Sequence, residues 1–183
     1  MTFSSHTTKS KLIIPLVFAC LVLFFSGKKA QEANEIDIIA NLIIPVSTPD
    51  GLRVLSMDRY PRFHVQLVNI SGESVRLWKD WNSWGWFNLT LKLETSEGVT
   101  YLRKKQPVWD GDFSDFWQIG PGESVILEVD MSSGHWQGMP DLYGETIPVK
   151  LTALYENRSD PLSEAFGIWT GKVSSNTVEA EWR

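Results

Sequence analysis

The sequence predicts an all-β protein in which two antiparallel sheets stack as a sandwich. Apolar and polar residues alternate with a period of two in four segments, which begin at Phe63, Phe87, Val125 and Val149. Turn signals that contain Gly, Pro or Ser separate these segments, and no window of about ten residues or more keeps a helical period. Short strands with one apolar face each are typical of a sandwich of about seven to nine strands.

The strands can be assigned in chain order from these patterns. Four of them have clear inward faces: Phe63, Val65 and Leu67; Phe87, Leu89, Leu91 and Leu93; Val125, Leu127, Val129 and Met131; and Val149, Leu151, Ala153 and Tyr155. Less regular runs complete the set at 36–46, 52–56, 73–78, 98–104 and 166–182. Near the end of its inward series, Tyr155 is expected to bury its ring while its hydroxyl bonds to backbone, as a sandwich corner tyrosine does.

An apolar N-terminal segment precedes the predicted sandwich. Residues 12–26 carry no charge and follow Lys9 and Lys11, which is the layout of a secretory signal helix. The run is shorter than the roughly 20 residues that a membrane-spanning helix needs. We therefore predict a signal peptide or signal anchor at 1–30 and a single sandwich domain at 31–183. Cleavage, retention as an anchor and lipidation at Cys20 remain open, in that order of preference.

Cysteine content and charge restrict the partners of the predicted domain. Cys20 is the only cysteine and lies in the apolar segment, so the domain has no internal disulfide and depends on packing. The chain has a formal net charge of −5, and all four charged residues of 1–30 are lysines, so the remainder is more acidic still. This balance excludes nucleic acid and anionic membrane surfaces as partners. The membrane is a partner only through an uncleaved N-terminal segment, and the protein is expected to be secreted, periplasmic or associated with the cell envelope.

Tryptophans concentrate before the second alternating segment. Trp81, Trp84 and Trp86 lie in KDWNSWGWFNLTLKLE, residues 79–94. If the strand extends back from Phe87, Trp84 and Trp86 share the outward phase of the polar residues; if it begins at Phe87, the preceding loop folds its indoles back over one end of the core. With Trp136, these three are the candidate ligand-facing aromatics.

The sequence offers no catalytic, cofactor-binding or metal-binding signature. Asp110, Asp112 and Asp115 form an acidic stretch, but Asp115 and Pro121 occupy the places where an EF-hand loop needs Gly and Glu. A looser calcium loop and a solvated acidic loop both remain open. His64 faces outward from its strand and His135 lies in a loop, with no GxSxG and no paired Cys/His spacing beside them. We therefore predict that the protein is not an enzyme.

A resemblance accompanies these patterns over roughly residues 60–182. Four stretches of the chain, taken in order, resemble the immunoglobulin-like sandwich of small exported bacterial proteins: FHVQLVNISGESVRLW, NLTLKLETSEGVTY, FWQIGPGESVILEVDM and IPVKLTALYEN. The layout is also similar to the intracellular proteinase inhibitor type of sandwich. GIWTGKVSSNTVEAEW resembles the close of uncharacterised exported bacterial proteins. The resemblance implies an immunoglobulin-like fold and carries no functional residue with it.

Three functions follow as hypotheses from the fold, the export signal and the missing reaction chemistry. The first is a non-catalytic module that acts through protein contacts at the cell envelope. The second is a carbohydrate-binding module, in which exposed indoles stack on a polysaccharide and an acidic loop holds structural calcium. The third is inhibition of an extracellular protease through the loop at 135–145.

Overall fold

The computed structural model describes residues 37–44, 51–56, 62–109, 111, 113–131, 134–139 and 145–183. These residues belong to one compact unit, Asn34–Arg183. The predicted signal segment at 1–30 lies outside the described residues. In the described part of the chain, no helix is both long enough and apolar enough to span a membrane.

The described residues are mostly in β-strands, which confirms the predicted all-β class. The single short helix among them is α1 (Pro161–Phe166). The strands are β1 (Ile38–Ile43), β2 (Val54–Leu55), β3 (Arg62–Asn69), β4 (Val75–Trp78), β5 (Leu89–Thr95), β6 (Gly98–Lys104), β7 (Phe116–Ile119), β8 (Ser124–Asp130), β9 (Trp136–Gln137), β10 (Ile147–Asn157) and β11 (Gly171–Trp182).

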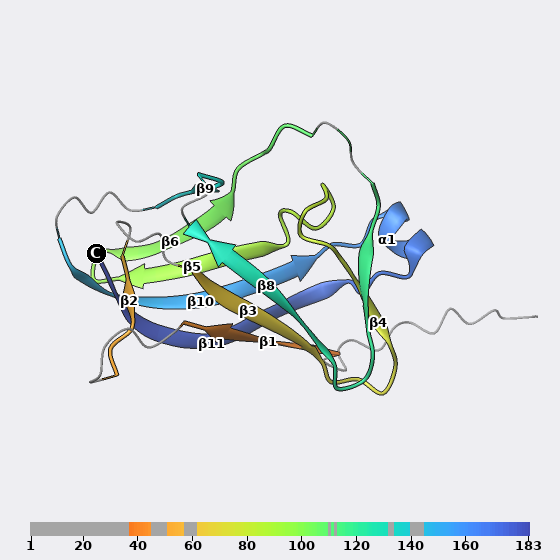
Figure 1. Cartoon of the computed structure of the whole chain (residues 1–183), viewed down its shortest axis with the longest axis horizontal. Coiled ribbons are helices and arrows are strands. Elements are labelled where there is room, and N and C mark those ends of the chain that lie inside the picture. The colour runs from red at the N-terminus through yellow and green to blue at the C-terminus, as the bar shows by residue number, and fades with distance from the viewer. Residues whose placement is uncertain are drawn as a thin grey trace, which may run out of the picture. The chain divides into compact units, whose positions relative to one another are not determined.

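The strands form a curled main sheet and a small second sheet. The main sheet has the order β8-β3-β1-β11-β10-β5-β6-β9, with β2 paired to β11, and β4 pairs with β7 in the small sheet. A parallel pairing with the register Ala40↔Ser175 joins β1 to β11, and the sheet curls at this junction. In Figure 1, β3 and β8 run across β5 and β10. Side chains of β1, β3 and β8 join side chains of β5, β10 and β11 in one apolar cluster. The arrangement is therefore compatible with a sandwich.

The core follows the alternation that the sequence predicts. Phe63, Val65 and Leu67 of β3 are fully buried, and so are Leu91 and Leu93 of β5, while the residues between them are partly exposed. Burying one large aliphatic side chain contributes about 1.5–3 kcal/mol to folding. The inward faces of these strands are therefore a major source of stability in a domain without disulfides.

The segment before β5 differs from the prediction that Phe87 belongs to the inward face. The strand begins at Leu89, and Phe87 is 45% exposed in a loop that spans 79–88. Asn82 is buried and holds this loop: its Oδ1 accepts a hydrogen bond from the Gly85 amide at 2.9 Å and its Nδ2 donates to the Asp115 carbonyl at 2.8 Å. A Cβ at Gly85 would collide with the backbone carbonyl of Lys79. The segment is thus a loop, as the second alternative has it, and Trp84 packs on the buried Trp78, but Trp81 is 48% exposed and does not fold back over the core.

One end of the sandwich carries β4, which the run at 73–78 predicted, together with β7 and α1, which the sequence patterns did not predict. Figure 1 shows β4, β7 and α1 at this end. The helix begins at its N-cap Asp160, whose side chain accepts a hydrogen bond from the Ser163 amide, and it ends at Gly167 with a φ of 61°. Trp78 of β4 is buried against the helix, with its ring centroid 5.6 Å from that of Phe166. The run predicted as strand from 166 therefore starts as strand only at Gly171.

Tyr155 meets half of its prediction. Its ring is 2% exposed and stacks on Trp169 at a centroid distance of 6.4 Å. Its hydroxyl is buried, however, and makes no hydrogen bond within the described part of the chain. The predicted corner hydrogen bond to backbone is absent there, so the residue acts through its ring. Burial raises the pKa of Tyr155 to about 12; the charge of Asp80 adds a smaller increase, and Asn88 opposes the rise.

Candidate functional site

Three of the four candidate tryptophans meet in one hollow of about 210 Å³, which we call the tryptophan hollow. The loop at 79–88 supplies one wall, and β6, β8, β9 and the residue before β9 supply the others. The lining residues are Asp80, Trp81, Trp86, Lys104, Glu128, Asp130, His135 and Trp136. Sequence positions separated by more than 50 residues thus contribute to a single site.

The three indoles are held to different degrees. Trp136 is 3% exposed in β9, and its indole N–H donates to the carbonyl oxygen of Asp130 at 3.1 Å. The indole N–H of Trp86 donates to the carbonyl oxygen of Lys105 at 2.7 Å. Trp81 is 48% exposed. Trp136 therefore forms part of the core as well as the floor of the hollow, and Trp81 offers the most ring surface to a ligand.

Trp84 lies elsewhere and does not join the other three. Its ring packs against Trp78 with a centroid distance of 5.5 Å and an interplanar angle of 32°. In the tryptophan hollow, Trp86 meets Trp109 and His135 edge-on, at 85° and 81°. The rings around Trp86 therefore do not form a flat platform. They line a recess in which a bound ligand would contact both ring faces and ring edges.

A lysine lies among these rings and provides a positive charge. The Lys104 side chain is 10% exposed, and its Nζ lies 4.3 Å from the centroid of the Trp86 ring and 3.9 Å from Oδ2 of Asp80. Burial lowers the pKa of Lys104, and the charge of Asp80 opposes this effect. The hollow thus already contains one cation in contact with an indole face.

The carboxylates at the hollow are also paired with cations. Arg62 contacts Asp130 at 3.1 Å and Glu128 at 3.7 Å, and Asp80 faces Lys104. These ion pairs leave several lone pairs of the carboxylates as hydrogen-bond acceptors, and the Lys104 ammonium is a donor. The recess therefore combines apolar ring surface with acceptors and a donor at close range.

The acidic stretch predicted as a calcium loop or a solvated loop is only partly described. Asp110 and Asp112 lie outside the described residues. Asp115 forms an ion pair with Lys79 at 2.7 Å, and the hydrogen bond from Lys79 lowers the pKa of Asp115. In the described part of the chain, no group of three or more His, Cys, Asp or Glu side chains is placed to hold a metal ion.

The two histidines follow the sequence prediction. His64 alternates with buried residues of β3, and His135 lies in the loop before β9 at the tryptophan hollow. The loop at 135–145, proposed for protease inhibition, is described only at 135–139 and 145.

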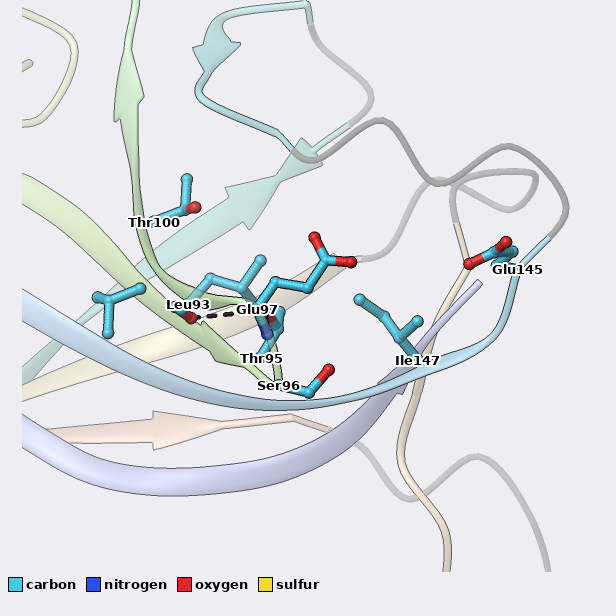
Figure 2. A pocket seen from close by; sticks show the side chains of 9 residues that line it. Leu93, Thr95, Ser96, Glu97, Thr100, Glu145 and Ile147 are labelled. Atoms are coloured by element: carbon cyan, nitrogen blue, oxygen red, sulfur yellow. Dashed lines mark hydrogen bonds between the residues drawn. The ribbon is translucent and has the colours of Figure 1, made fainter.

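Two further hollows lie on the described surface. One, of about 850 Å³, lies over the outward faces of β5, β6, β10 and β11, and we call it the outer-face hollow. The other, of about 240 Å³, surrounds the turn between β5 and β6. Figure 2 shows Glu97 and Glu145 on opposite sides of this third hollow, with Ile147 between them in the view. Among the described residues of its lining, the only charged side chains are these two glutamates, so we do not treat it as a candidate site.

Sequence reasoning missed Asp80, Lys104, Glu128 and Asp130 as members of the site. A signal for one of them was present: alternation in β6 puts Lys104 on the same inward face as the buried Leu102. A lysine at an inward position of a strand is unusual and indicates a partner or a cavity. The three acids gave no such signal, because they come from different segments of the chain.

Comparison with protein-family models, curated proteins and solved structures found no match for this chain.

Proposed function

We propose that this protein is a non-catalytic binding module that holds a saccharide unit in the tryptophan hollow. The observation that carries the proposal is the meeting of Trp81, Trp86 and Trp136 with carboxylates and a buried lysine in one recess. Pyranose rings present apolar C–H faces that pack on indoles, and their hydroxyls donate and accept hydrogen bonds. The recess supplies both kinds of contact.

The charge arrangement favours a neutral hydroxylated ligand over a cationic one. A cation would seek the face of an indole, but the Lys104 ammonium already lies over Trp86, at 4.3 Å. It would also seek carboxylates, and these face Arg62 and Lys104. A sugar hydroxyl needs only the lone pairs that those ion pairs leave available.

The proposal includes an immunoglobulin-type sandwich for the fold. Its support is the strand order: β1, β3 and β8 form one side, while β6, β5, β10 and β11 form the other. This order matches strands A, B and E facing strands C′, C, F and G of that type. We also propose export, on the strength of the charged and then apolar layout of residues 1–30.

The test is calorimetric titration of the full-length chain with a panel of neutral oligosaccharides. We expect one member to bind, and we expect Trp81→Ala to weaken its binding about tenfold, which corresponds to about 1.4 kcal/mol. Trp81 suits this test because its exposure makes the variant tolerable to the fold. The matched control is Phe113→Ala, which removes an aromatic ring that is 74% exposed and lies outside the hollow.

Two results would contradict the proposal. The first is that no oligosaccharide of the panel binds the unmodified chain. The second is equal weakening by Trp81→Ala and Phe113→Ala, which would show that the hollow has no special role.

A second candidate function, contact with another protein, is favoured by a different surface. Ile39 and Ile43 of β1 and Ile126 of β8 are 37%, 45% and 58% exposed on the outward face of the β8-β3-β1 side. The three side chains share one sheet face on the two strands that flank β3, and exposed apolar side chains that gather on one face are typical of protein interfaces. A photo-crosslinking residue at Ile126 should capture one defined protein in the cell envelope, whereas the same residue at Lys150 on the other outward face should not. Equal patterns from both positions would refute this candidate.

A further inference from the structure

The outer-face hollow is built by register neighbours of the main sheet. Leu154, Thr90, Arg103 and Gln137 are successive partners across β10, β5, β6 and β9. Because directly opposed residues share one face, these four side chains form a row on the solvent side. Lining residues from the loop before β5 and from the segment after β10 lie along one side of the row, where these two strands start and end. The volume of about 850 Å³ lies within the range of about 300–1,000 Å³ that is usual for ligand sites.

The lining of this hollow carries an excess of positive charge. On its exposed side it contains Arg103, Arg158 and Lys172, against the carboxylates of Glu156 and Asp160, while the ammonium of Lys104, which also lines it, lies on the inward side beside Trp86 and Asp80. This excess contrasts with the whole chain, whose formal net charge is −5. The contrast indicates a site for an anionic ligand.

The carboxylates of the hollow are engaged within the protein, whereas one cation is not paired with any. Glu156 contacts Arg158 at 3.1 Å and Lys172 at 4.0 Å, and Asp160 caps the N-terminus of α1. The guanidinium of Arg103 lies 5.8 Å from the centroid of the Tyr101 ring, and no described carboxylate is within ion-pair distance of it. Arg103 is therefore available to bind a ligand carboxylate through two parallel hydrogen bonds.

Exposed rings flank the row and indicate the rest of the ligand. Phe87 and Tyr101 both line the hollow, and each is 45% exposed. Ring faces of this kind pack on the C–H faces of a pyranose, and Thr90, Gln137 and Asn88 supply hydrogen-bonding groups for its hydroxyls. An added peptide strand is disfavoured at β5 and β10, because both are paired along both sides.

We propose that the outer-face hollow binds a glycan that carries carboxylates, such as a polyuronate, with Arg103 as the principal carboxylate-binding residue. The inference goes beyond the proposed function, because the two hollows share only Lys104 among the residues that the structure describes. An acidic glycan on the outer face and a neutral saccharide in the tryptophan hollow are separate binding events.

The experiment measures binding of a fluorescently labelled oligogalacturonate to the full-length chain by anisotropy. A neutral oligogalactose of equal length and a polyglutamate peptide of equal charge serve as competitors. We expect oligogalacturonate to bind and its affinity to fall as salt is added, since the Arg103 contact is exposed. Both competitors should displace it at least about tenfold less well than the unlabelled oligogalacturonate.

Variants assign the binding to the hollow. Arg103→Gln should weaken oligogalacturonate binding at least about tenfold, and Arg103→Lys should weaken it less because the charge remains. The matched control is Lys150→Gln, which removes a cation from the same outward sheet face but outside the hollow. The affinity of this control should equal that of the unmodified chain. Circular dichroism of each variant checks that the fold is kept.

Four outcomes would overturn the inference. They are no binding of oligogalacturonate, equal displacement by the neutral glycan, equal displacement by polyglutamate, and equal effects of Arg103→Gln and Lys150→Gln. The Trp81→Ala chain separates the two proposals, because a loss of neutral saccharide binding in this variant together with unchanged oligogalacturonate binding means that each hollow acts alone. Loss of both ligands in Trp81→Ala would overturn the separate role of the outer face.

Discussion

Arg103 and Lys104 are consecutive residues of β6, yet they occupy opposite sides of the main sheet. The Lys104 side chain is 10% exposed and lies under Trp86 in the tryptophan hollow. Arg103 is exposed on the outer face beside Tyr101. The same strand thus contributes a cation to each hollow, in surroundings that differ in burial and in partners.

This difference in burial separates residues that would contribute only to binding from residues that also stabilise the fold. In the tryptophan hollow, Trp136 and Lys104 also belong to the packed interior, so replacing them changes the free energy of unfolding as well as any affinity. On the outer face, the lining side chains stand on a sheet that is already folded beneath them. Surface substitutions of that kind usually change stability by about 0.5 kcal/mol or less. Three predictions test this contrast.

The largest effect on stability is expected for Trp136→Ala. Removing a 97% buried indole, together with its hydrogen bond to Asp130, leaves a cavity and should lower the free energy of unfolding by about 3–5 kcal/mol. Trp81→Ala removes the same side chain from a half-exposed position and should cost about 1 kcal/mol or less. Urea unfolding of both variants measures the contrast. Similar losses of unfolding free energy would mean that Trp81 and Trp136 belong equally to the core.

An effect confined to high pH is expected for Tyr155. Its pKa is raised from 10.0 to about 12, so the folded chain retains a proton that the unfolded chain loses between these pH values. Stability is therefore lost as the pH rises through this window, by about 2–3 kcal/mol. In Tyr155→Phe this contribution to the alkaline loss should disappear. At pH 7 the variant should differ from the unmodified chain by about 1 kcal/mol or less, since no hydrogen bond of the hydroxyl is broken.

Unfolding curves at pH 7 and at several points up to pH 12 measure this effect. Tyr101→Phe, which removes a hydroxyl from a 45% exposed ring, is the control. An unchanged alkaline decline in Tyr155→Phe would refute the assignment to this residue.

The smallest effect is expected for Lys104→Met. Burial lowers the pKa of Lys104 below 10.5, so between the lowered pKa and 10.5 the unfolded chain binds more protons than the folded chain. Below that window the buried charge of Lys104 destabilises the folded chain by its full amount, and this destabilisation decreases as the pH rises through the window. Relative to the unmodified chain, Lys104→Met should be most stable at neutral pH and should lose this advantage as the pH approaches 10.5. Lys150→Met removes an exposed lysine and should not show this trend.

Parts of the fold were predictable from local patterns. Alternation placed β3, β5, β8 and β10, because a strand with one buried face repeats every second residue. The same rule failed at Phe87, because periodicity does not show where a strand starts. The buried amide of Asn82 holds the loop, and the strand begins only at Leu89. The helix α1 was also recoverable, because Asp160, Pro161 and Gly167 are its N-cap, first-turn and C-cap signals. A six-residue helix is too short for a periodicity search to detect.

The candidate site was predictable only in part. The tryptophans were conspicuous by their number, but the sequence did not show that Trp84 packs on Trp78 while Trp86 and Trp136 line the same hollow. The acids of the hollow were indistinguishable from other surface acids. Their roles depend on which loops the sheet brings together.

By itself, the sequence determined the strand-rich class and the inward faces of the main strands, because the pleat repeats every two residues and each residue's local phase sets its face. The tertiary structure decided how the sheet curls, that β5 begins only at Leu89, and which distant side chains share a hollow. Those features depend on contacts between residues far apart in the chain, and no local pattern records them. That is also why two adjacent basic residues of β6 face such different surroundings.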